Sequence, residues 1–299
     1  MNENLLNINE HHQNQRIDNY LFFKFKFIPK TKIYSAIRKG EIRINSKRAK
    51  ASSKLNINDI VRVPPYFLTS KTINEHQSLS KDRFLPIIFE DDDFIVVDKP
   101  AGISAHSGTK NAYGVIEICR EQFKNKDLDL CHRIDRSTSG IILLSKNKSF
   151  LRYFHDQLME NQTTKEYLAI VHGDKKEKIF TMNNEIELKH GTTRQAISEF
   201  KLVGKNKKYS LYLVKIETGR MHQIRIHCLS LDMPIVNDKK YGNAKLDKKL
   251  FDNSAFKEMG LHAYKLAFKD RLGKENTFYS DITSTWSEFL SKENIVVNL

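Results

Sequence analysis

The stretch that decides the fold reads Cys131-His132-Arg133-Ile134-Asp135-Arg136-Ser137-Thr138-Ser139-Gly140, and the apolar run 141–144 follows it. The apolar run has the length of a short buried strand, and the polar residues before it predict a tight turn. Asp135 therefore lies where a strand begins. The basic residues His132, Arg133 and Arg136 lie within three positions of it. Nearby cations keep a carboxylate ionised, so Asp135 is a candidate nucleophile or base, although an Asp in such a turn more often caps the turn.

Strand and helix patterns surround this turn without a regular repeat. Strands are expected over 87–89 and 94–97, with an acidic turn between them. A helix is expected from Ser149, because Phe150, Phe154 and Leu158 recur at helical spacing. Further strands are expected over 167–171 and 211–216. Mixed elements without β-α-β alternation predict an α+β domain with a mixed or antiparallel sheet over residues 84–299.

Positive charge is concentrated near the N-terminus. The 299-residue chain has a net charge of +14, and residues 16–62 hold thirteen Lys or Arg against three acids, a surplus of ten. A uniform compositional bias would spread this charge along the chain. Its concentration favours a surface that binds nucleic acid.

Residues 16–65 are expected to form a small basic module. A first helix is expected near Ile17, and a second from an N-cap at Thr31 to a stop at Gly40. Alternating residues over 42–45 and 60–63 predict a hairpin. The phosphate-binding residues expected in this module lie near the second helix and the turn after it. They are Arg38, Lys39, Arg43, Lys47 and Arg48.

The remaining segments are polar or lack the signals of other protein classes. Residues 1–15 are expected to be a flexible N-terminus and 66–83 a linker. No apolar run approaches the roughly 20 residues of a membrane helix, and the N-terminus lacks the pattern of a signal peptide, so we expect a cytoplasmic protein. The three cysteines, Cys119, Cys131 and Cys228, have neither metal-ligand spacing nor the number that a disulfide scaffold needs.

The segment around Asp135 resembles the His-Arg-Leu-Asp-x-x-Thr-Ser-Gly signature of the RluA-type pseudouridine synthases, with Ile134 in the Leu position. Five further motifs follow the family's order: Lys99-Pro100-Ala101-Gly102, Lys165-Glu166-Tyr167-Leu168-Ala169, Thr218-Gly219-Arg220-Met221-His222-Gln223-Ile224-Arg225-Ile226-His227, Pro234-Ile235-Val236-Asn237-Asp238-Lys239-Lys240-Tyr241-Gly242 and Leu261-His262-Ala263. The basic module resembles an S4 RNA-binding domain. One departure is Asp232 in place of a Gly that favours positive φ, a conformation that Asp tolerates.

The resemblance implies that the chain isomerises uridine to pseudouridine in RNA without a cofactor. It makes Asp135 the catalytic carboxylate, which attacks C1′ or removes a ribose proton. Tyr167 would pack against the flipped-out base and relay a proton, and Arg225 would hold Asp135 charged in a bidentate pair. Arg133 would fill the space that the base leaves. Lys165 and Arg220 either bind phosphate or face water.

The sequence lacks the usual signals for a bound cofactor or metal. We find no Gly-rich phosphate loop and no metal-ligand spacing, so neither a cofactor nor a metal is expected. His222 and His227 lie five residues apart, which does not suit a helical metal pair, and they are interpreted as structural. A monomer is expected.

The domain arrangement resembles that of family members that act on the large ribosomal subunit, and this resemblance favours 23S ribosomal RNA as the substrate. Two alternatives remain open, a synthase that acts on transfer RNA and a catalytically silent RNA-binding factor for ribosome assembly. A glycoside hydrolase is disfavoured, because no second carboxylate is evident in the sequence.

Overall fold

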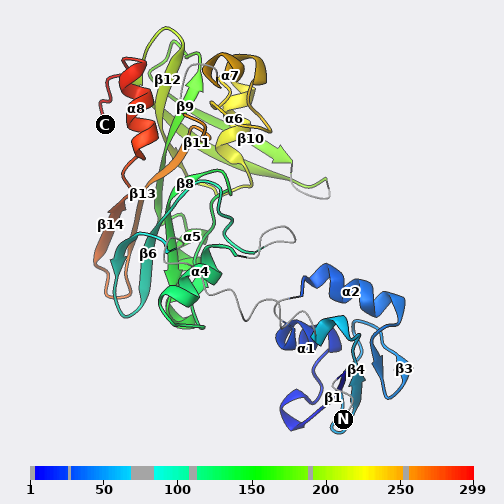
Figure 1. Ribbon diagram of the computed structural model, residues 1–299. Coiled ribbons are helices and arrows are strands. Elements are labelled where there is room, and N and C mark those ends of the chain that lie inside the picture. Colours follow the sequence, from blue (N-terminus) through cyan, green and yellow to red (C-terminus); the bar gives the residue numbers. More distant parts are fainter. Residues whose placement is uncertain (1–3, 26–27, 69–83, 108–112, 188–190, 252–255) are drawn as a thin grey trace. The chain divides into compact units, whose positions relative to one another are not determined.

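The computed structural model describes residues 4–25, 28–68, 84–107, 113–187, 191–251 and 256–299. The chain divides into two compact units, Met1–Asp82 and Arg83–Leu299. Both are drawn in Figure 1, and each is described here by itself.

The first unit combines a small sheet with two helices. Its strands are β1 (Leu5–Asn7), β2 (Arg43–Ile44), β3 (Lys47–Arg48) and β4 (Ile60–Arg62), in the order β1-β4-β2-β3. The helices are α1 (Ile17–Lys24) and α2 (Lys30–Lys39), and a 3-10 turn covers Glu10–His12. Helix α2 begins at Lys30 with Pro29 at its N-cap, one residue before the expected cap at Thr31. It ends, as expected, at Gly40, which takes a left-handed conformation with φ 74°.

The prediction of a flexible N-terminus over 1–15 is wrong for the described part of that segment. Strand β1 pairs with β4, with Leu6 opposite Val61, and Ile8 is buried in the core of the unit. Strand β1 is short and lies among polar Asn and His residues, so the sequence pattern did not indicate it. It forms one edge of the sheet. Phe67 is also fully buried in this core, so the linker does not begin at residue 66. The rest of the predicted linker, 69–83, lies outside the described residues.

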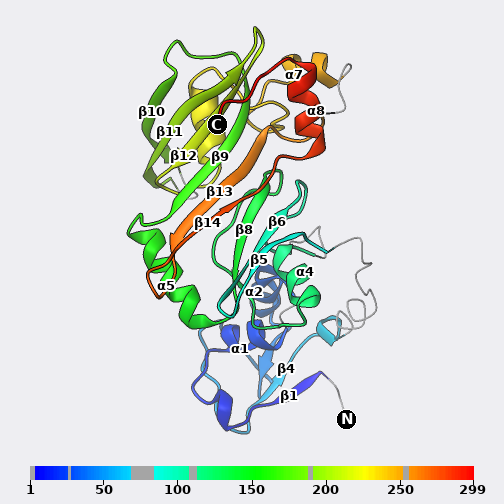
Figure 2. The ribbon, with the colours of Figure 1, turned by 90° about the vertical axis from the view of Figure 1, so that its left-hand side faces the viewer.

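The second unit is built on a long sheet, whose strands lie next to one another across the view in Figure 2. Within the described residues its strand order is β10-β11-β12-β9-β13-β8-β6-β5, with β14 beside β13 and β7 beside β8. The strands are β5 (Ile87–Glu90), β6 (Phe94–Lys99), β7 (Asp129–Leu130), β8 (Ser139–Ser145), β9 (Thr164–His172), β10 (Ile179–Glu187), β11 (Thr193–Lys205), β12 (Tyr209–Ile216), β13 (Leu261–Lys269) and β14 (Glu275–Tyr279). The neighbouring strands are antiparallel except for the pair β8 and β13. The fold is therefore α+β on a mixed sheet, as the sequence predicts.

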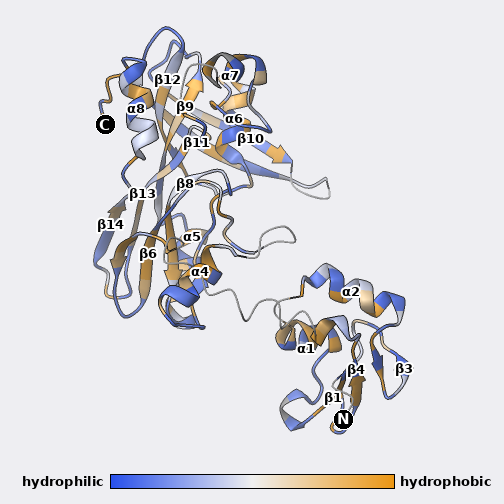
Figure 3. Cartoon of the chain, viewed as in Figure 1, coloured by the Kyte–Doolittle hydropathy of each residue, from blue (hydrophilic) through white to orange (hydrophobic). Residues whose placement is uncertain are grey.

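Five helices are described around this sheet: α4 (Val115–Gln122), α5 (Lys148–Met159), α6 (Gln223–Ser230), α7 (Ala244–Phe251) and α8 (Ser284–Lys292). Helix α5 begins at Lys148, one residue before the expected start at Ser149, and the side chain of Asn147 caps it by accepting a hydrogen bond from the Phe150 backbone N–H. Phe150 and Phe154 are fully buried on its inner face. Figure 3 shows hydrophobic residues along β6 and β8, against which this face packs.

Close packing in the centre of the sheet determines where the functional side chains lie. Gly140 has φ 106°, and a Cβ on it would lie 2.2 Å from the carbonyl oxygen of Ala263. In the strand register Gly140 pairs with Ala263, and Ala263 pairs with Tyr167 on the next strand. The turn before β8, which carries Asp135, is thereby placed near Tyr167 on β9. Among the described helices none has the length and apolar character to cross a membrane.

Candidate active site

Asp135 lies in the turn between β7 and β8, and three contacts fix this turn. The Asp135 carbonyl accepts a hydrogen bond from the Thr138 backbone N–H at 3.1 Å. The Arg136 carbonyl accepts from the Gly102 N–H at 2.7 Å, while Arg136 Nε donates back to the Gly102 carbonyl at 2.7 Å. The turn is thus clamped to the segment after β6, and its carboxylate is held in one place.

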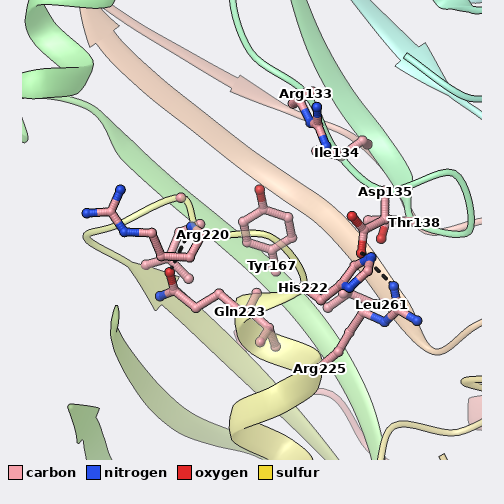
Figure 4. Close-up of a pocket in the computed structure, with 13 residues that line it drawn as sticks. Arg133, Ile134, Asp135, Thr138, Tyr167, Arg220, His222, Gln223, Arg225 and Leu261 are labelled. Atoms are coloured by element: carbon pink, nitrogen blue, oxygen red, sulfur yellow. Dashed lines mark hydrogen bonds and ion pairs between the residues drawn. The ribbon is translucent and has the colours of Figure 1, made fainter. Parts of the chain in front are cut away.

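Arg225, on α6, lies between two carboxylates, that of Asp135 in the turn before β8 and that of Asp238 in the segment after α6. Figure 4 shows its contact with Asp135. Its Nη1 donates to Asp135 Oδ2 at 2.8 Å. Its Nε and Nη2 donate to the two oxygens of Asp238, at 2.7 and 2.8 Å. Burial opposes the charge of Arg225, but hydrogen bonds to Asp238 and then Asp135 raise its pKa above the ordinary value. The family resemblance predicts a bidentate pair between Arg225 and Asp135. Arg225 instead forms the bidentate pair with Asp238, and Asp135 accepts a single hydrogen bond from Nη1.

Asp238 orients the guanidinium of Arg225 through two hydrogen bonds. It is 3% exposed, and burial alone would raise its pKa, but hydrogen bonds from Arg225 and from the backbone N–H groups of Lys240 and Tyr241 lower it. Asp238 thus stays ionised and holds the guanidinium in a fixed plane. The sequence contains it in a recognisable motif, but no local pattern reveals that it faces Arg225.

Tyr167 stands on β9 and lines the same pocket as Asp135 and Arg225. In Figure 4 its ring stands between Asp135 on one side and Arg220 on the other. Burial, and then the negative charge of Asp135, raise the pKa of Tyr167 well above its ordinary value. The phenol therefore keeps its proton and can donate it. The structure brings all three sequence-predicted catalytic residues, Asp135, Tyr167 and Arg225, to one pocket.

One of the basic residues next to Asp135 is not a cation. His132 Nε2 accepts a hydrogen bond from the Leu143 backbone N–H at 3.1 Å, which requires an unprotonated nitrogen. Burial, and then the charge of Lys165, lower the pKa of His132 to about 4. The inference that His132 helps to keep Asp135 ionised is therefore wrong, and the charge that contacts the carboxylate comes from Arg225.

Lys99 is a further charged group beneath the turn. Its side chain is fully buried, and its Nζ donates to the carbonyls of Pro100 at 3.0 Å and Arg136 at 3.2 Å. Burial lowers the pKa of Lys99 to about 7, although the charges of Asp135 and Asp98 raise it. The sequence shows this lysine only as part of a motif after a strand, and its contact with the Asp135 turn becomes visible only in three dimensions.

The pocket around Asp135 is small, about 80 Å³, and two wider hollows share its lining. One of about 490 Å³ is lined by the basic side chains of Arg133, Lys165 and Arg220, together with Leu158 and Tyr167 among others. Burial, and then the charge of Arg220, lower the pKa of Lys165. The other hollow, of about 440 Å³, lies along 104–106 and 133–137. Arg133 lines all three spaces.

The predicted RNA-binding residues of the first unit lie close together on its surface. Arg38 and Lys39 end α2, and Arg43, Lys47 and Arg48 lie on the β2–β3 hairpin, whose strands pair Arg43 with Arg48. All five side chains are exposed. Arg48 reaches across to donate a hydrogen bond to the Arg38 carbonyl, which joins the hairpin to the end of the helix. The cluster can therefore contact phosphates as one surface.

The two histidines interpreted together as structural differ in position. His227 is fully buried, and burial lowers its pKa to about 4. His222 instead lines the small pocket and one hollow, with Nε2 at 3.8 Å from Asp135 Oδ2. The spacing of the two histidines in the sequence did not indicate that His222 lies beside Asp135. Among the described residues no cluster of three or more His, Cys, Asp or Glu side chains could hold a metal ion.

The chain is similar to known proteins along most of its length. A model of the RNA pseudouridylate synthase family matches residues 93–230, and a model of the S4 domain matches residues 15–61. The chain is 38% identical over 273 residues to the ribosomal large subunit pseudouridine synthase C of Buchnera aphidicola subsp. Acyrthosiphon pisum (strain APS), with 87% of each chain covered.

Two further comparisons concern another relative and a solved structure. The chain is 37% identical over 284 residues to the protein of the same name from Haemophilus influenzae, covering 89% of this chain and 87% of that one. The solved structure of human RNA pseudouridylate synthase domain containing 4 has a TM-score of 0.61 at 20% identity, covering 72% of this chain and 95% of that one. At this identity the structural likeness concerns the fold alone.

Proposed function

Because the chain belongs to the RNA pseudouridylate synthase family, we propose that it converts uridine to pseudouridine in 23S ribosomal RNA of the large subunit, with Asp135 as the catalytic carboxylate. One observation carries the role of Asp135. Its carboxylate accepts a hydrogen bond from Arg225 at 2.8 Å in a pocket that also contains the protonated phenol of Tyr167. The proposal that the substrate is 23S ribosomal RNA rests on the relatives, which are named for the large ribosomal subunit.

The reaction is an isomerisation whose atoms balance without a co-reactant. The bond between N1 and C1′ breaks, the base turns, and a bond between C5 and C1′ forms. C5 loses its hydrogen and N1 gains one. The carboxylate of Asp135 either attacks C1′ or removes a ribose proton, and the hydrogen bond from Arg225 orients it in both cases. Tyr167 supplies a flat surface for the base and a phenolic proton beside it.

The pocket and its neighbouring hollows suit an RNA whose target base leaves the stack. The small pocket holds the uridine against Asp135. Arg133, which lines all three spaces, enters the gap left by the base, while Lys165 and Arg220 bind the phosphates beside it. The exposed cluster of Arg38, Lys39, Arg43, Lys47 and Arg48 supplies further phosphate contacts from the S4 domain.

The choice of RNA is tested by mapping pseudouridines in a strain that lacks this gene. Carbodiimide treatment followed by primer extension is applied to ribosomal and transfer RNA. We expect one or more pseudouridines to disappear from 23S ribosomal RNA and to return when the gene is restored. Unchanged ribosomal RNA together with a loss from transfer RNA would contradict the ribosomal assignment. Unchanged modification in both RNAs would contradict the enzymatic function.

A further inference from the structure

His222 occupies a strained backbone position directly beside the catalytic carboxylate. It precedes α6 with φ 58° and ψ 22°, a left-handed conformation that is uncommon for residues other than Gly, although Asn, Asp and His adopt it more often than the rest. Its side chain is 19% exposed and lines both the small pocket and the hollow along 133–137. A residue held in an unfavourable conformation at the edge of a pocket points to a role for its side chain there.

The imidazole of His222 connects Asp135 to Tyr241. Nε2 lies 3.8 Å from Asp135 Oδ2, and Nδ1 lies 3.1 Å from the Tyr241 hydroxyl. The backbone N–H of Tyr241 donates to Asp238 Oδ1 at 3.1 Å. Asp238 therefore connects to Asp135 by two routes, one through Arg225 and one through Tyr241 and His222. Figure 4 shows His222 and Arg225 beside Asp135.

Burial and the surrounding charges determine whether the His222 ring is neutral, and its two neighbours determine which nitrogen carries the proton. Burial lowers the pKa of His222, Arg225 and Lys240 lower it further, and Asp135 and Asp238 raise it. The net shift is downward, so the ring is neutral near pH 7 and carries one N–H. A carboxylate can only accept, so the N–H faces Asp135 from Nε2. Nδ1 then accepts a hydrogen bond from the Tyr241 hydroxyl.

We propose that His222 is a positioning residue for Asp135, and that Tyr241 fixes the His222 tautomer whose Nε2–H points at the carboxylate. This role rests on the proposed isomerisation. The distance of 3.8 Å is longer than a hydrogen bond, and such contacts often shorten when the substrate fills the site. Within the described residues Arg225 and His222 both approach Oδ2 of Asp135. Together they leave Oδ1 for the ribose.

Two substitutions at residue 222 separate this role from a purely structural one. His222→Asn suits the left-handed backbone but is too short for its amide to reach Asp135. His222→Gln places its amide N–H near the position of Nε2. In the full-length protein under single turnover, we expect His222→Asn to lower the rate of pseudouridine formation roughly tenfold to a hundredfold, the range of one hydrogen bond to a charged group. We expect His222→Gln to restore most of that rate, and RNA affinity to stay unchanged in both.

Tyr241→Phe completes the test, because it removes the hydroxyl and keeps the ring. We expect it to lower the rate in the wild-type background and to have no further effect in the His222→Asn background. A wild-type rate for His222→Asn, an equal loss in His222→Gln, or additive losses in the double variant would each overturn the proposal. An active wild-type enzyme in the same assay keeps these outcomes distinct from a failure of the proposed function, in which no variant and no wild-type protein would form pseudouridine.

Discussion

At the scale of single residues, the site depends on a shared arginine. Arg225 uses three N–H groups to join Asp135 to Asp238, so one side chain fixes the proposed catalytic carboxylate relative to α6. The sequence predicts Asp135, Tyr167 and Arg225 as a set through family motifs. It does not reveal Asp238 or His222 as contacts, because these contacts arise from the way the chain folds before and after α6.

Arg225→Lys should disturb both carboxylates, since an ammonium cannot reproduce the planar bridge. We expect the rate of pseudouridine formation to fall at least tenfold, and the free energy of unfolding to fall by roughly 1–3 kcal/mol because a buried acceptor loses its donor. The exposed pair of Arg271 with Asp93 is a matched control. Arg271→Lys should cost less than about 1 kcal/mol and leave the rate unchanged. Equal effects of the two substitutions would contradict this view of Arg225.

His132 makes part of the stability depend on pH. Its pKa in the folded chain is about 4, below the ordinary value of 6.5, so folding favours the neutral ring. This contribution is complete above pH 6.5 and is lost as pH falls from 6.5 toward 4, by up to about 1.4 kcal/mol per pH unit. His132→Gln retains an acceptor for the Leu143 N–H but does not titrate. Denaturant unfolding should show the wild-type advantage shrinking over that window, and a constant difference would contradict the assignment.

At the scale of elements, the register of three neighbouring strands builds the site. Gly140 on β8, Ala263 on β13 and Tyr167 on β9 lie in one row across the sheet. The sequence predicts each of these strands except β13, because their cores are short apolar runs. It misses the hairpin of β10 and β11, whose outer strand is mostly exposed and contains Asn183, Asn184 and Glu185. Such a strand is stabilised by backbone pairing, which leaves little hydrophobic pattern.

Gly140→Ala should break this row. The new Cβ would lie 2.2 Å from the Ala263 carbonyl oxygen, at a φ of 106° that side chains rarely adopt. We expect a loss of more than about 3 kcal/mol in the free energy of unfolding, from the clash and the backbone strain together. Gly173→Ala is the control, because Gly173 also has positive φ but has no atom within 4 Å of an added Cβ. It should cost about 1–2 kcal/mol. Denaturant titration of both variants would contradict the role of this contact if the losses were equal.

At the scale of the whole molecule, charge and chemistry reside in different units. Residues 16–62 hold a surplus of ten positive charges, and the residues proposed for catalysis all lie beyond residue 82. The sequence predicts this division from charge distribution, because solvated basic side chains need no three-dimensional context. The sequence does not predict the two ends of the basic unit. Leu6 and Phe67 pack into its core there, but the segments around them are short or polar and show no clear pattern.

Removing charge from the S4 domain should change how salt affects RNA binding. Arg38, Lys39 and Lys47 are exposed, and replacing all three by Gln should make the slope of log Kobs against log salt shallower by about 2 to 3. The rate for bound RNA should stay unchanged. Replacing the exposed Lys176, Lys178 and Lys207 removes the same charge from the second unit. An equal change of slope in both triple variants would contradict a specific phosphate-binding surface on the S4 domain.

The central claim is that the carboxylate of Asp135 performs the isomerisation. Forming the bond between C5 and C1′ expels the hydrogen on C5, so RNA carrying tritium at uridine C5 releases it to water as pseudouridine forms. We expect the wild-type chain to release tritium, and the isosteric Asp135→Asn variant to bind the same RNA with unchanged affinity and release none. Release by Asp135→Asn at the wild-type rate would contradict the account.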